Sequence, residues 1–72
     1  MTLNQLSIGD SAVITKINAD KELKSRLNSF GLIKGNLVLV NELSLAKKTY
    51  GCVINGHKVA LRYSEAAKIE VN

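Results

Sequence analysis

The one nucleophile and base pair that the sequence offers consists of Cys52 and His57, which are also its candidates for soft-metal binding. They lie on either side of Asn55-Gly56, the favoured dipeptide of a two-residue type I′ β-hairpin. Pairing across this turn sets Ile54 opposite His57 and Cys52 opposite Val59, so the thiol and the imidazole share a face only diagonally. We therefore expect a small buried hydrophobe at Cys52 and a hairpin-tip residue at His57, with weak divalent-metal binding by the pair as the alternative.

The other residues that could support catalysis or ligand binding are dispersed. The carboxylates form no ligand cluster for a hard cation and are Asp10, Asp20, Glu22, Glu42, Glu65 and Glu70. The glycines each have a turn or strand-edge explanation, and none forms a phosphate-cradling loop. We therefore expect no catalysis and no cofactor.

Length and composition describe a small chain without an internal disulfide or a structural metal site. Its 72 residues carry a formal net charge of +4, and we expect them to form one domain over residues 1–72. One cysteine cannot form an internal disulfide, and one cysteine with one histidine cannot supply the four ligands of a structural zinc site. No stretch reads as a secretory signal or a spanning helix. The sequence therefore predicts a reduced, cytoplasmic protein that would reach a membrane only through a partner.

An amphipathic helix is predicted to begin after Asn18 or Asp20, either of which can cap it. Apolar side chains recur there at helical spacing, namely Leu23, Leu27 and Phe30. Gly31 is expected to end the helix in the left-handed conformation, with Leu27 and Leu32 making the hydrophobic contact of a Schellman motif.

Period-2 patterns and turn signals predict five strands, over residues 12–18, 37–45, 50–54, 57–63 and 68–71. Short turns are expected at residues 2–5 and 64–67, and a type II turn is expected at Lys34-Gly35. In the second strand we expect leucines 37, 39, 43 and 45 on one face and valines 38 and 40 on the other, with the first half covered on both sides. This order predicts a mainly β fold, a small SH3-like antiparallel barrel with one amphipathic helix between its first two strands.

The positive charge leaves a nucleic-acid-binding barrel as an alternative function. Basic and aromatic side chains that could gather around the hairpin are Lys47, Lys48, Lys58, Arg62, Tyr50 and Tyr63. Aromatic residues make up only 4% of the chain, and both tyrosines have good core positions, so we expect no nucleic-acid partner.

These residues resemble, in chain order, the pattern of the FeoA family of ferrous iron transport accessory proteins. The opening of that pattern matches Leu3, Leu6 and Gly9, and its central segment matches Arg26-Leu27, Gly31-Leu32 and Gly35. Its ending matches Gly56, Val59-Ala60-Leu61-Arg62, Glu65-Ala66, Ile69 and Val71. The sequence departs from the pattern at Lys34, where members often carry proline, and at residues 46–49, where they often have a Gly-Asp-Pro turn.

The resemblance implies an SH3-like accessory protein that docks on the cytosolic GTP-binding region of the membrane iron transporter FeoB and modulates its assembly or activity. A module of iron-dependent regulation and direct binding of Fe2+ are the alternatives. The candidate partner-binding residues are Arg26, Lys47, Lys48, Arg62 and Glu65. An equally simple interpretation is that the arginines and Glu65 brace the helix and final turn against the barrel. Self-association through leucines 32, 43 or 45, if exposed, is a further expectation.

Overall fold

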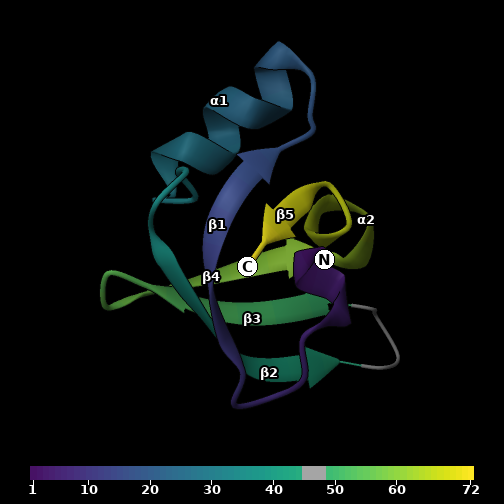
Figure 1. Cartoon of the computed structure of the whole chain (residues 1–72), viewed down its shortest axis with the longest axis vertical. Helices are drawn as coiled ribbons and strands as arrows, with labels where there is room; N and C mark the ends of the chain where they lie inside the picture. Colours follow the sequence, from purple (N-terminus) through teal and green to yellow (C-terminus); the bar gives the residue numbers. More distant parts are fainter. Residues whose placement is uncertain (45–48) are drawn as a thin grey trace.

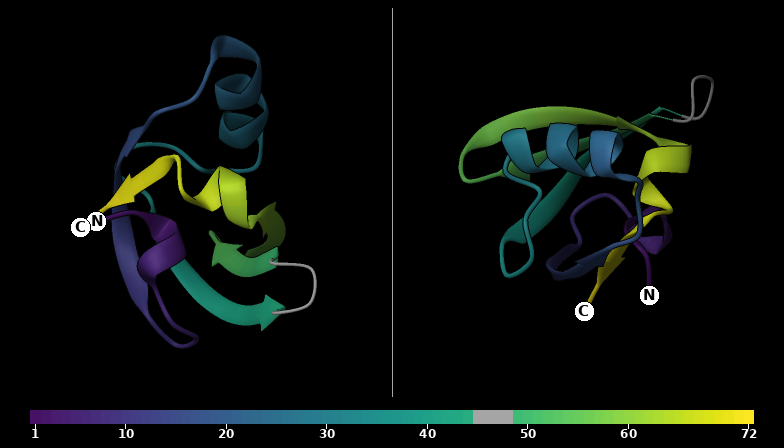
Figure 2. Two further views of the ribbon diagram at one scale, coloured as in Figure 1. Left: turned by 90° about the vertical axis from the view of Figure 1, so that its right-hand side faces the viewer. Right: turned by 90° about the horizontal axis from the view of Figure 1, so that it is seen from above.

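One five-stranded antiparallel sheet forms the body of the protein and curls around a hydrophobic core (Figures 1 and 2). The computed structural model describes residues 1–44 and 49–72. After a 3-10 turn at Leu3–Gln5, the elements are β1 (Ser11–Ile17), α1 (Lys21–Ser29), β2 (Leu37–Ser44), β3 (Thr49–Ile54), β4 (His57–Arg62), α2 (Tyr63–Ala66) and β5 (Ile69–Val71). The strand order is β4-β3-β2-β1-β5. This architecture confirms the predicted mainly β fold with a helix between the first two strands.

The β3–β4 hairpin has the predicted turn and register. Asn55 and Gly56 both adopt positive φ, at 52° and 80°, as a type I′ turn requires. Ile54 pairs with His57, and Cys52 pairs with Val59. The turn dipeptide therefore predicts the register of the hairpin and, with it, which side chains share a face.

Helix α1 also begins and ends where local signals place it. The Asp20 side chain caps its start by accepting a hydrogen bond from the Leu23 N–H at 2.8 Å. Gly31 has a φ of +95°, and the Leu32 N–H donates to the Leu27 carbonyl at 3.1 Å. This is the Schellman pattern, and it places both leucine side chains in the core.

The second strand departs from its prediction in two ways. Val38 and Val40 are buried as expected, but Leu37 and Leu39 are exposed, because none of the described residues forms a second layer over the outer face of the sheet here. The pairing of β2 with β3 shifts between Val40 and Glu42, a bulge that turns Leu43 to the core side. The expectation that Leu43 shares a face with Leu37 and Leu39 is therefore wrong.

Gly51 occupies the β3 position opposite this bulge. A β-carbon at Gly51 would lie 2.9 Å from the β-carbon of Glu42, closer than two such atoms approach. A glycine inside a strand pattern is a recognised sign of a bulge or a close backbone approach, so the sequence did contain this signal.

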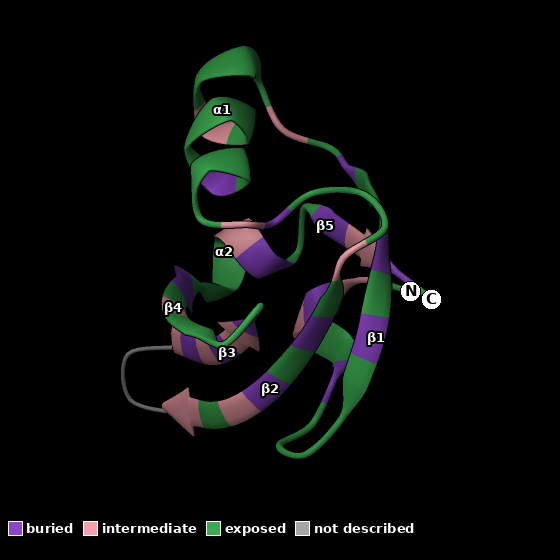
Figure 3. Ribbon diagram, turned by 90° about the vertical axis from the view of Figure 1, so that its left-hand side faces the viewer, coloured by how far each residue is buried: buried purple, intermediate pink, exposed green. Residues whose placement is uncertain are grey.

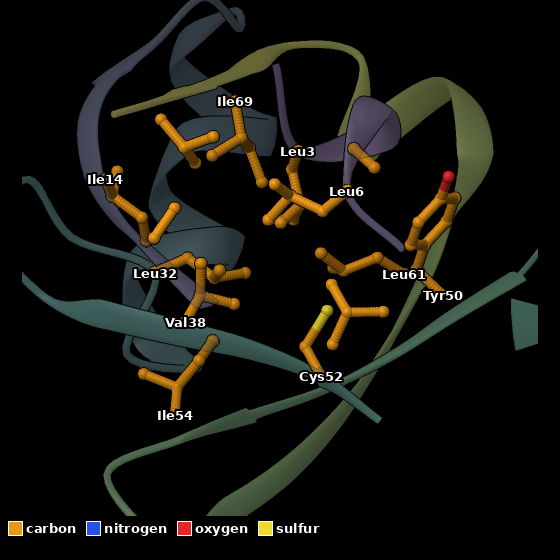
Figure 4. Close-up of a cluster of buried hydrophobic side chains, with 14 of the residues drawn as sticks. Leu3, Leu6, Ile14, Leu32, Val38, Tyr50, Cys52, Ile54, Leu61 and Ile69 are labelled. Carbon is orange, nitrogen blue, oxygen red and sulfur yellow. The ribbon is translucent and has the colours of Figure 1, made fainter. Parts of the chain in front are cut away.

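The core is a single cluster of aliphatic side chains together with Cys52 and Tyr50 (Figure 4). Leu32 lies fully inside it and Leu43 packs against it, so the expectation that they form an exposed patch is wrong. Leu45 lies outside the described residues. Phe30 was expected beside Leu27, but it occupies the C-cap of α1 and is exposed; after the chain reverses at Gly31, Leu32 is the next apolar residue to enter the core.

The two ends of the chain run side by side (Figure 2). The Val71 N–H donates to the Met1 carbonyl at 2.8 Å, and Thr2 forms a bridge with Glu70. Within the described residues, no helix combines the length and apolar character needed to cross a bilayer.

Candidate functional site

Three of the predicted partner-binding residues meet where α1 faces α2. Arg26 on α1 forms an ion pair with Glu65 Oε2 on α2. The other carboxylate oxygen, Oε1, accepts the Arg62 backbone N–H at 2.9 Å and so caps the start of α2. The Glu65 side chain is 13% exposed and the Arg26 side chain 54% exposed. The geometry therefore gives Arg26 and Glu65 a bracing contact, while the exposed Arg62 side chain remains available to a partner.

Replacing Glu65 separates these two contributions. Glu65→Ala removes both the ion pair and the cap, and we expect it to lower the free energy of unfolding by about 1–2 kcal/mol. Glu65→Gln keeps an oxygen for the Arg62 N–H, so we expect a loss of no more than about 0.5 kcal/mol, the value of a half-exposed ion pair. Urea unfolding of both variants measures the difference, and two unchanged midpoints would contradict the bracing role.

A second surface lies on the outer face of the sheet and was not predicted. Val13 on β1 pairs with Leu37 on β2, and the next outward residue of β2, Leu39, pairs with Val53 on β3. Val13, Leu37 and Leu39 are 40%, 57% and 37% exposed, and Val53 is half-buried. We call these four residues the outer apolar stripe; Figure 3 shows that exposed segments alternate with buried ones along β1 and the first part of β2. Adjacent exposed apolar side chains of this kind often mark a protein interface.

Basic side chains border this stripe on β4. Lys58 pairs with Val53 across the strands and Arg62 pairs with Thr49, and both side chains are exposed. Lys47 and Lys48, the other basic candidates, lie outside the described residues. The outer face of the sheet thus combines an apolar centre with a basic edge, an arrangement common in protein interfaces.

The two metal-ligand candidates lie in different environments. Cys52 is fully buried in the core, whereas His57 is exposed at the start of β4. Burial raises the pKa of the Cys52 thiol to about 11, which disfavours the thiolate that a metal ligand must be. Among residues 1–44 and 49–72, no three histidine, cysteine or acidic side chains gather into a group that could hold a metal ion.

The buried thiol makes stability depend on alkaline pH. Folding raises the pKa of the thiol from 9.0 to about 11, so the folded state binds the thiol proton more tightly than the unfolded state does. The stability linked to this proton is fully present below pH 9.0 and is lost as the pH rises toward about 11. The free energy of unfolding should fall by as much as about 1.4 kcal/mol per pH unit in that window. Cys52→Ala should remove this part of the slope in urea unfolding series; equal slopes in the two proteins would contradict it.

The two tyrosines considered for base stacking also differ in burial. Tyr50 is buried, its hydroxyl donates to the Asn4 carbonyl at 2.6 Å, and burial raises its pKa. Tyr63 is exposed, with its ring centre 5.9 Å from that of Tyr50. Tyr50 therefore works as a core residue and offers no face to a base.

Comparison with known proteins agrees with the resemblance in the sequence. The FeoA domain family matches residues 1–72. A Campylobacter jejuni protein named as Fe(2+) transport protein A is 46% identical over 72 residues, covering 100% of this chain and 97% of the relative. A Porphyromonas gingivalis protein, named as a fusion of Fe(2+) transport protein A with the Fe(2+) transporter FeoB, is 31% identical over 71 residues, covering 99% of this chain and 8% of the fusion.

Solved structures extend the similarity to three dimensions. The crystal structure of a Stenotrophomonas maltophilia FeoA complexed with zinc, described as a prokaryotic SH3 domain protein, aligns with a TM-score of 0.87 at 28% identity. The alignment covers 100% of this chain and 89% of that one. The curled five-stranded sheet is therefore an SH3-like barrel, as predicted.

Proposed function

The chain belongs to the FeoA family of Fe(2+) transport proteins, and from this premise we propose that it serves ferrous iron uptake by docking on the cytosolic GTP-binding region of FeoB. It acts there from the cytoplasmic side as a binding partner. Docking biases the assembly or activity of the transporter, and the barrel itself hydrolyses no nucleotide. Iron is the cargo of the transporter in this proposal and needs no site on the barrel.

The observation that carries the choice of partner is the natural fusion in Porphyromonas gingivalis. There, a segment similar to residues of this chain is covalently joined to FeoB. Covalent linkage keeps two modules at high effective concentration, which favours pairs that work together. The same association between separate chains requires an exposed interface on the barrel.

The outer apolar stripe and its basic edge are the surface we assign to this contact. A hydrophobic anchor such as Leu37 gains the most from being covered, and exposed cations such as Lys58 steer an acidic partner surface toward it. The Arg26–Glu65 pair lies by contrast between α1 and α2 and is already used within the fold.

The test is a titration of the purified chain into the cytosolic region of FeoB from the same organism, in nucleotide-free, GDP-bound and GTP-analogue-bound states. We expect a saturable complex in at least one state, together with a change in GTP hydrolysis or in transporter assembly. Full-length FeoB in detergent repeats the measurement in case the isolated region lacks part of the interface. No complex with either preparation in any state would overturn the proposal; a complex that changes neither hydrolysis nor assembly would overturn its modulating role.

A further inference from the structure

A hollow of about 430 Å³ is lined by residues from the end of β1, from α1 and from the loop after α1. Lysines from all three elements line it: Lys16 from β1, Lys24 from α1 and Lys34 from the loop. The Asn28 amide, one helical turn after Lys24, and the Thr15 hydroxyl complete its polar lining. We call this hollow the lysine pocket.

The lysine pocket carries an excess of positive charge. No acidic residue lines it, and within the described part of the chain none of its three lysines is in an ion pair. Glu70, the cross-strand neighbour of Lys16, lies outside the lining and accepts a hydrogen bond from the Asn18 side chain; its single charge offsets at most that of Lys16, so the pocket keeps a net positive charge. Three like charges around one hollow repel one another, and that repulsion is relieved when a multivalent anion binds between them.

We propose that the lysine pocket binds a phosphate-bearing anion of two or more charges. Lysine ammonium groups bind phosphate as mobile point charges, and the neutral Asn28 amide and Thr15 hydroxyl can donate to further phosphate oxygens. The hollow has room for linked phosphates or a phosphorylated headgroup. This site is separate from the outer apolar stripe and does not depend on docking to FeoB.

Two sources share this chemistry, a soluble polyphosphate group such as that of a nucleotide and the headgroup of an anionic lipid. Inorganic tripolyphosphate, titrated in calorimetry and in amide NMR spectra, tests the first source. Cosedimentation with phosphatidylglycerol vesicles, against vesicles of pure phosphatidylcholine, tests the second. We expect saturable binding to at least one probe, weakening as salt is raised, with NMR shifts centred on Lys16, Lys24 and Gly35.

A matched pair of variants distinguishes a site from general surface charge. The pocket variant is Lys16→Gln, Lys24→Gln and Lys34→Gln; the control is Lys21→Gln, Lys58→Gln and Lys68→Gln, at exposed positions outside the pocket. Each removes three positive charges from the net charge of +4 and so leaves +1.

We expect the pocket variant to lose about tenfold or more in affinity and the control no more than about threefold. Thermal unfolding confirms that both fold, which is expected because all six lysines are exposed. If the pocket variant loses affinity for tripolyphosphate, the ligand is a soluble anion. If it loses affinity only for anionic vesicles, the ligand is a lipid headgroup. Equal losses in the two variants, or no binding to either probe, would overturn the proposal.

Discussion

Leu32→Ala is expected to leave about half of the molecules or more unfolded at room temperature. Leu32 is fully buried, and its backbone N–H and side chain both belong to the Schellman motif that ends α1. Truncating a buried leucine to alanine costs about 3–5 kcal/mol. A core in a domain of this size supplies about 3–5 kcal/mol of net stability, so the substitution removes nearly all of it.

The neighbouring Ile33→Ala is the matched control, because Ile33 is exposed although it adjoins Leu32 in the chain. We expect it to change the free energy of unfolding by no more than about 0.5 kcal/mol. Circular dichroism melts of the two variants and the parent protein measure the contrast. A Leu32→Ala melt within a few degrees of the parent would show that α1 contributes little to the core.

Leu37→Ser is expected to weaken the complex with the cytosolic region of FeoB by about tenfold or more. Leu37 is the most exposed residue of the outer apolar stripe, so covering it provides the largest gain from that surface. Full burial of a leucine side chain is worth about 1.5–3 kcal/mol, and about 1.4 kcal/mol corresponds to tenfold in affinity. Stability should change by less than about 1 kcal/mol, the span of strand propensity at an exposed position.

Phe30→Ser controls for the loss of an exposed apolar side chain, since Phe30 lies at the C-cap of α1, outside the stripe. Calorimetric titration of both variants should show affinity lost only with Leu37→Ser. Unchanged affinity for Leu37→Ser would remove the stripe from the interface, and a loss confined to Arg62→Ala would move the interface to the basic edge.

Features set by neighbouring residues were predictable from the sequence. Asn55-Gly56 determines the hairpin register, and Leu27 with Gly31 and Leu32 determines how α1 ends. The exposure of Leu37 depends instead on whether another layer covers the sheet, which alternation along one strand does not report. The inward turn of Leu43 required the bulge opposite Gly51, whose sign in the sequence was a single glycine.

The candidate surfaces also differ in how far the sequence predicts them. A bracing role for Arg26 and Glu65 against the barrel is one of the two alternatives that the resemblance leaves open. Their pairing with each other depends on the approach of α1 to α2, which the sequence does not report. The lysine pocket gathers Lys16, Lys24 and Lys34 from three different elements. No spacing in the sequence predicts that convergence, since it depends on where the fold places α1 and the loop after it relative to the end of β1.

The bridge between the two ends of the chain has an architectural consequence. Because the Val71 N–H is bonded to the Met1 carbonyl, both ends leave the barrel at one point. A longer polypeptide could carry this domain at its N-terminus, at its C-terminus or inserted in a surface loop. The barrel would be attached through the same part of its surface each time. In each of these arrangements, the outer apolar stripe and the lysine pocket would lie at the same positions relative to the point of attachment.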